Sequence, residues 1–125
     1  MIYGIGIDLC SIRRVQNIKD LNKFAYKILT SHEIEYLNTL DQKNSVNYLA
    51  KQFAAKEALS KALGTGLTGD VKLNLIEIDR DQSGKPYIKM NDHMKTLLSK
   101  IGVNSTFVSL ADDSDYAIAT VILER

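Results

Sequence analysis

The sequence is poor in the residues that mark secreted and zinc-binding proteins. Its 125 residues include a single cysteine, Cys10, so no intramolecular disulfide can form and an oxidising compartment has no support. His32 has no second histidine or cysteine at the spacing of zinc ligands. The apolar residues 1–10 are few and lack a basic leader, which argues against a signal peptide or a membrane span. We therefore expect a cytoplasmic protein.

The sequence also lacks internal repeats, low-complexity runs and linkers rich in proline or serine. With 45% hydrophobic and 25% charged residues, it has the composition and length of one soluble domain over residues 1–125. The net charge of +1 indicates no particular class of partner. A local basic segment nevertheless stands out, and neither a nucleic-acid-binding motif nor interleaved aromatic residues accompany it. Its residues are Arg13, Arg14, Lys19, Lys23 and Lys27.

Periodicity and capping signals predict an α+β domain, with a mainly antiparallel sheet packed on one long helix and shorter helices beside it. We expect a leading strand at residues 3–10, helices at 12–18, 30–40, 45–63 and 91–102, and strands at 71–78, 87–90, 106–111 and 116–123.

The leading strand alternates between an apolar face and a face of small residues. Ile5, Ile7 and Leu9 point one way, whereas Gly4, Gly6 and Asp8 point the other. The apolar set predicts a core face. The glycine face has two interpretations: a shallow groove for a ligand, with Asp8 at its end, or room for a closely packed helix.

The helix at residues 45–63 carries an apolar stripe that continues into Glu57, with Lys61 one turn further. In one interpretation, Glu57 and Lys61 form a weak pair on a solvated surface. In the other, Glu57 faces a polar site, such as a metal site, at the edge of the core. The stripe consists of Val46, Leu49, Ala50 and Phe53.

Asp8 and Glu57 together suggest a site for a hard divalent cation. Mg²⁺ prefers one or two carboxylates and keeps waters and substrate phosphates as its other ligands. Lys56 and Lys61 lie beside Glu57 and would add positive charge for phosphates. This combination suits phosphoryl transfer, in which positioning and charge stabilisation do most of the catalysis.

Two blocks of the sequence resemble the signature blocks of the phosphopantetheinyl transferases. The first is Gly6-Ile7-Asp8, and the second is residues 53–58, FAAKEA, followed by Lys61 and by Gly-Thr-Gly at 64–66. The short length, the Gly-Lys-Pro turn at 84–86 and the closing strand at 116–119 resemble the small branch, holo-acyl-carrier-protein synthase. The likeness extends over nearly the whole chain.

The resemblance implies a Mg²⁺-dependent enzyme that moves phosphopantetheine from coenzyme A to a serine of apo acyl carrier protein, in support of fatty acid biosynthesis. Asp8 and Glu57 would bind the Mg²⁺ ion, which holds the pyrophosphate of coenzyme A. Lys61 would stabilise charge on the transferring phosphoryl group. Glu57, directly or through a metal-held water, would help to deprotonate the serine.

The resemblance also implies where the ligands bind. The coenzyme would contact Lys56 and Lys61, the loop Gly64, Thr65 and Gly66, and Pro86. Arg14 matches an arginine that meets the acidic carrier protein. Members of this branch form homotrimers with active sites between neighbouring subunits. The family implies neither a nucleic-acid nor a membrane partner.

The sequence departs from the family at Gln52, where many members have arginine, and at Phe107, where many have histidine. It also has Ala111-Asp112 where some members have Ser-His. No histidine role is therefore implied here. Two other functions use the same residues. A small metal-dependent phosphohydrolase would share the carboxylates, but it is disfavoured because a phosphate loop and further acidic ligands are lacking. A non-catalytic assembly module would use the glycines and the Glu57–Lys61 pair only structurally.

Overall fold

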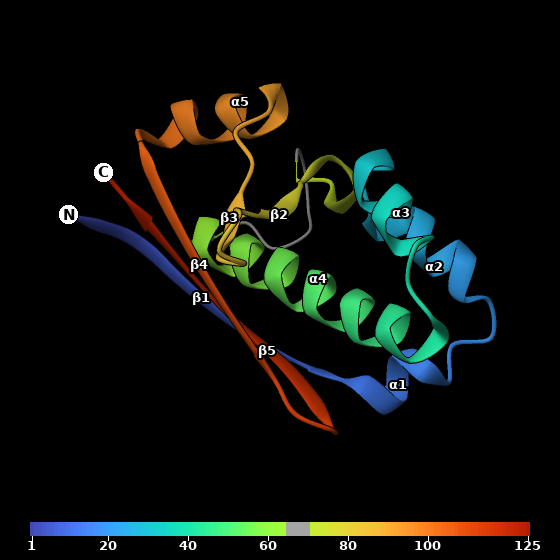
Figure 1. Cartoon of the computed structure of the whole chain (residues 1–125). Helices are drawn as coiled ribbons and strands as arrows, with labels where there is room; N and C mark the ends of the chain where they lie inside the picture. Colours follow the sequence, from blue (N-terminus) through green and yellow to red (C-terminus); the bar gives the residue numbers. More distant parts are fainter. Residues whose placement is uncertain (65–70) are drawn as a thin grey trace.

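A computed structural model of the chain describes residues 1–64 and 71–125, and it confirms the α+β class. Helices α1 to α4 lie in the first half of the chain, between the first and second strands (Figure 1). The elements are β1 (Ile2–Ser11), α1 (Ile12–Gln16), α2 (Leu21–Ile28), α3 (Ser31–Leu37), α4 (Gln42–Leu63), the 3₁₀ turn η1 (Leu73–Leu75), β2 (Ile78–Arg80), β3 (Pro86–Ile88), α5 (Asp92–Ile101), β4 (Ser105–Asp112) and β5 (Tyr116–Glu124).

Two antiparallel sheets surround the long helix α4. The larger has the strand order β1-β5-β4, so the first strand of the chain pairs with the last, and the smaller is the hairpin of β2 and β3. Helix α4 packs along β1 and β5, while α2 and α3 lie on another side of it (Figure 1). The core therefore lies around α4, of which Leu49, Ala54, Ala58 and Leu59 are almost completely buried.

Several helix ends lie where the sequence predicts them, because capping depends on local residues. Ser11 caps α1 by accepting a hydrogen bond from the N–H of Arg14. The capping box that begins at Thr30 forms with Glu33, as expected. Gly64 ends α4 in the left-handed conformation, with a φ of 81°, which glycine adopts without a steric penalty.

The prediction for the two faces of β1 is wrong in one respect. Ile5, Ile7 and Leu9, predicted as core, are between 55% and 60% exposed. The glycine face meets α4 instead: a Cβ atom on Gly6 would overlap the carbonyl oxygen of Ala58, and one on Gly4 would overlap that of Ala62. The glycines thus make room for a closely packed helix, which was the second interpretation.

The outward face of the larger sheet is consequently apolar and uncovered by any described element. The strand register places Ile5 beside Ile122 and Ile122 beside Phe107, and it places Leu9 beside Ile118. Phe107 is 52% exposed. A continuous exposed apolar face of this kind marks an interaction surface more often than a free surface.

Other differences from the predicted elements are small. Helix α4 begins at Gln42, three residues earlier than expected, because Asp41 caps it. Residues 73–75, predicted as strand, form the 3₁₀ turn η1. The separate helix α2 was not predicted. Among the described residues, no helix is long and apolar enough to cross a membrane.

Candidate functional site

Asp8 and Glu57 lie where β1 and α4 pack together. Asp8 points from the glycine face of β1 toward the helix, three residues before the strand ends. The Lys61 ammonium lies 3.2 Å from Asp8 Oδ1 and donates a hydrogen bond of 2.9 Å to the Ile7 carbonyl oxygen. The lysine thus pairs with Asp8 across the two elements.

One cavity contains both carboxylates. Its volume is about 390 Å³, and Asp8 and Glu57 form part of its wall together with Arg14 of α1. The other lining residues are mostly apolar, and they come from β1, α1, α2 and α4: Leu9, Cys10, Ser11, Val15, Ile18, Phe24 and Phe53. The structure therefore brings Glu57 into the same cavity as Asp8 and Arg14, which lie more than forty residues earlier in the sequence.

The surroundings of Glu57 make its charged form unfavourable. Burial raises the pKa of the Glu57 carboxyl above its usual value, and the negative charge of Asp8 raises it further, whereas Lys61 lowers it. Two carboxylates that raise each other's energy in this way are the donors that a hard cation such as Mg²⁺ binds. The arrangement supports the second interpretation of Glu57, at a polar site on the edge of the core.

The prediction that Lys56 contacts a ligand does not fit its position. Its side chain is completely buried, and its ammonium donates to the Glu33 carboxylate and to the carbonyl oxygens of Ile28 and Leu73. Burial lowers the pKa of Lys56, and the Glu33 charge opposes this effect. Consecutive helix positions point about 100° apart, so Lys56 faces the interior while Glu57 faces the cavity.

The remaining predicted residues lie around this centre at different places. Arg14 is exposed on α1 at the wall of the cavity. Gly64 forms the carboxyl end of α4, and Pro86 begins β3, opposite Arg80. Thr65 and Gly66 lie outside the described residues. The described lining of the cavity includes neither Gly64 nor Pro86, so a ligand that met all of them would extend beyond it.

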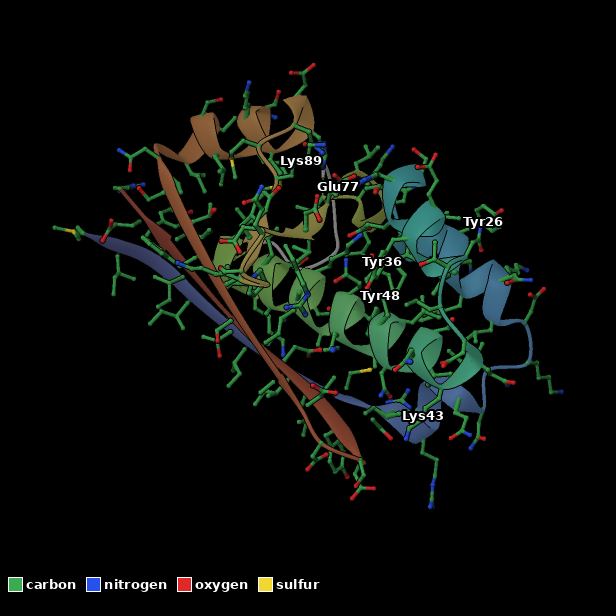
Figure 2. All side chains as sticks on the ribbon, viewed as in Figure 1. Tyr26, Tyr36, Lys43, Tyr48, Glu77 and Lys89 are labelled. Atoms are coloured by element: carbon green, nitrogen blue, oxygen red, sulfur yellow. The ribbon has the colours of Figure 1, made fainter. Side chains whose placement is uncertain are left out.

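A second polar group was not predicted. His32, Glu77 and Asp79 bring ligand atoms within 4.8 Å of one another. The Glu77 carboxylate already accepts a hydrogen bond of 2.8 Å from the Thr30 hydroxyl and lies 3.2 Å from the Lys89 ammonium (Figure 2). Because a lysine occupies this group, it suits a cation less well than the site at Asp8 and Glu57.

We expect the pKa of Glu57 to respond in opposite directions to its two charged neighbours. In metal-free protein, Asp8→Asn should lower it because a negative neighbour is removed, and Lys61→Met should raise it because a positive one is removed. Titration of the carboxyl carbon by NMR measures both changes. Lys27→Met, on α2, is the control and should leave the pKa unchanged. Two shifts of the same sign would contradict this geometry.

Comparisons with known proteins identify the family of this chain. A family model described as 4'-phosphopantetheinyl transferase superfamily matches residues 4–121. The holo-[acyl-carrier-protein] synthase of Buchnera aphidicola is 42% identical, over 98% of each chain. The crystal structure of that enzyme from Neisseria meningitidis superposes with a TM-score of 0.92 at 39% identity, over 100% of both chains. A structure from Bacillus anthracis, in complex with CoA (3',5'-ADP), has a TM-score of 0.84 at 34% identity, over 98% of this chain and 96% of the other. The chain therefore belongs to the 4'-phosphopantetheinyl transferase superfamily.

Proposed function

We propose that this protein is a holo-acyl-carrier-protein synthase. It transfers phosphopantetheine from coenzyme A to a serine hydroxyl of apo acyl carrier protein, releases adenosine 3',5'-bisphosphate, and so serves fatty acid biosynthesis. The observation that carries this proposal is the meeting of Asp8 and Glu57 in one cavity, with Lys61 beside them, in a chain that matches the family over residues 4–121.

The residues at this site fit a Mg²⁺ ion. Both donors are carboxylates, the oxygen ligands that Mg²⁺ prefers, and burial together with the nearby negative charge of Asp8 raises the pKa of Glu57. Asp8 and Glu57 would hold the ion. When bound, Mg²⁺ supplies charge neutralisation for the pyrophosphate of coenzyme A.

The chain's own residues perform the remaining tasks. Lys61 has a side chain that is 54% exposed, so its ammonium can reach a phosphoryl oxygen and stabilise the charge that develops during transfer. Glu57, directly or through a metal-held water, would help to deprotonate the serine hydroxyl. The coenzyme extends toward Gly64 and toward Pro86, and the contacts that the family resemblance implies for Thr65 and Gly66 lie outside the described residues. Lys56 is excluded from direct contact by its burial.

The acyl carrier protein docks beside the cavity on the basic segment, with Arg14 as its anchor. Arg14 is exposed, and it forms the wall of the same cavity as Asp8 and Glu57. An acidic partner held there would bring a serine to the carboxylates. Electrostatic attraction of this kind mainly increases the association rate and weakens as salt is added.

The assembly is a homotrimer formed through the outward face of the larger sheet. In one subunit this face exposes Ile5, Ile7, Leu9 and Phe107, which a partner copy would bury. The same strand, β1, carries Asp8 on its opposite side, so a contact on this face places a neighbouring subunit one strand thickness from the cavity. An active site between subunits is consistent with this layout.

Mass spectrometry of apo carrier protein after incubation with this protein, coenzyme A and Mg²⁺ tests the reaction. We expect a mass gain equal to the phosphopantetheine arm. Asp8→Asn and Glu57→Gln should each lower the rate roughly a hundredfold, since a bound metal contributes several kcal/mol of charge stabilisation. Asp92→Asn, on α5, is the matched control and should retain its activity. Near-normal turnover by either site variant would show that the metal assignment is wrong.

Reversing the charge of Arg14 should separate the two substrates. Arg14→Glu is expected to raise KM for the carrier protein about tenfold and to leave KM for coenzyme A nearly unchanged, with added salt giving the same pattern. Lys95→Glu makes the same charge change on α5 and should affect neither value. An equal increase for both substrates would refute a docking role for Arg14.

A charge on the outward sheet face should dissociate the trimer. We expect sedimentation equilibrium to give three times the chain mass of 14.0 kDa for the wild type and a single chain mass for Ile5→Glu. Tyr26→Glu places the same charge on an exposed apolar residue of α2 and should leave the trimer intact. A wild type that sediments as one chain would rule out this assembly.

A further inference from the structure

The proposed reaction gives no task to the Lys56 side chain, although it is the largest completely buried side chain among the described residues. Its ammonium donates to three different segments: the Glu33 carboxylate of α3, the carbonyl oxygen of Ile28 at the end of α2, and that of Leu73 in η1. Replacing a buried ion pair with apolar residues is often neutral or stabilising. A gain in stability therefore does not account well for this lysine.

The Glu33 carboxylate is held by two consecutive turns of α4. Lys56 donates to Oε1, and Gln52, four residues earlier on the same helix, donates to Oε2. The backbone N–H groups of Thr30 and Ile78 complete its partners, at 2.9 and 3.0 Å. Glu33 is thus hydrogen-bonded to the start of α3 and to β2, and it accepts two hydrogen bonds from one side of α4.

The glycine face of β1 packs closely against a second side of α4. Gly4 and Gly6 lie so close to the backbone of Ala58 and Ala62 that no Cβ atom would fit between them. Successive residues of a helix are about 100° apart around its axis, so Glu57 lies about 100° from Lys56 and about 100° from Ala58. The Glu57 side chain therefore leaves the helix between its two fixed sides.

This arrangement sets the rotation of α4 about its axis. A rotation of about 10° would move the Glu57 carboxylate by roughly 1 Å, because the end of a long side chain lies well outside the backbone cylinder. Misplacement by 1 Å at a reacting centre can cost about a hundredfold in rate. The relative position of Glu57 and Asp8 depends both on the hydrogen bonds of Glu33 to α4 and on the packing of β1 against α4, since Asp8 belongs to β1 and Glu57 to α4.

We propose that Lys56 and Glu33 form a positioning pair, which holds Glu57 at the rotation where it shares a divalent cation with Asp8. The pair acts through the helix and touches neither cation nor substrate. This inference rests on the proposed function for the identity of the metal ligands, and it assigns a task to two residues outside the cavity that contains them.

The double variant Lys56→Met/Glu33→Gln tests the pair, because it removes both charges and leaves no buried ion without a partner. The probe is Mn²⁺ alone, whose binding is followed by electron paramagnetic resonance, together with steady-state transfer kinetics. We expect the Kd for Mn²⁺ to rise about tenfold and kcat to fall about tenfold, the range found for groups that orient metal ligands. KM for the carrier protein should stay within about twofold, since Arg14 is unaltered.

The control is Met94→Ala, a completely buried residue of α5 whose loss lowers stability through a cavity. It should leave the Kd for Mn²⁺ and kcat within about twofold. Gln52→Met is a milder variant that keeps the ion pair and removes one of the two hydrogen bonds from α4 side chains to Glu33. We expect it to raise the Kd for Mn²⁺ about threefold. It decides the question if circular dichroism shows the double variant to be unfolded.

An unchanged Kd for Mn²⁺ in the folded double variant, or in Gln52→Met where that variant decides, overturns the positioning role whatever happens to kcat. Failure of the proposed function gives a different result. A wild type that binds Mn²⁺ but adds no mass to the carrier protein overturns the transferase, and the comparison of Mn²⁺ affinities still decides the role of Lys56. A wild type that binds no Mn²⁺ overturns both.

Discussion

The close contact between β1 and α4 determines where the chemistry of this protein can lie. The two elements approach until backbone meets backbone, which only glycine at positions 4 and 6 allows. Asp8 follows on the same face of the strand, and Glu57 precedes Ala58 on the helix. The packing contact between β1 and α4 therefore lies directly beside the two carboxylates. Packing and proposed function depend on the same pair of elements.

A second consequence concerns the opposite side of the sheet. Because the glycine face is turned toward the helix, the Ile5, Ile7 and Leu9 side chains are turned outward. Both faces of β1 thus favour burial, but α4 covers only the glycine face. The trimer that we propose would bury the outward face of β1. The same contact would also place the active site between subunits.

Local signals in the sequence predicted much of the fold, because helix caps and turns depend on neighbouring residues. Thr30 with Glu33, Asn91 and Gly102 mark helix ends that the structure confirms. The faces of β1 could not be assigned in the same way. Strict alternation shows that a strand has two unlike faces, but which one meets the helix depends on a partner more than forty residues away.

The candidate site was predictable in part for the same reason. Asp8, Glu57 and Lys61 were found as charged residues placed against an apolar pattern, and the structure brings them together. Lys56 was misplaced, because a sequence does not say which side of a helix a neighbouring helix will cover. Its partner Glu33 was recognised as a capping residue, yet the same carboxylate also accepts from Lys56 and Gln52 in the interior. One side chain serves two structures, and only the local one is visible in the sequence.

The ion pair between Lys61 and Asp8 has a consequence for the order of events. An ammonium and a dication compete for the same carboxylate oxygens, and Lys61 donates to Asp8 in the protein alone. Asp8 and Glu57 would hold the metal that we propose, and the Lys61 ammonium would then be available to a phosphate of the coenzyme. Lys61 would thus neutralise Asp8 in the metal-free protein and bind a phosphate once the metal is present. Metal binding would in this way favour binding of the coenzyme.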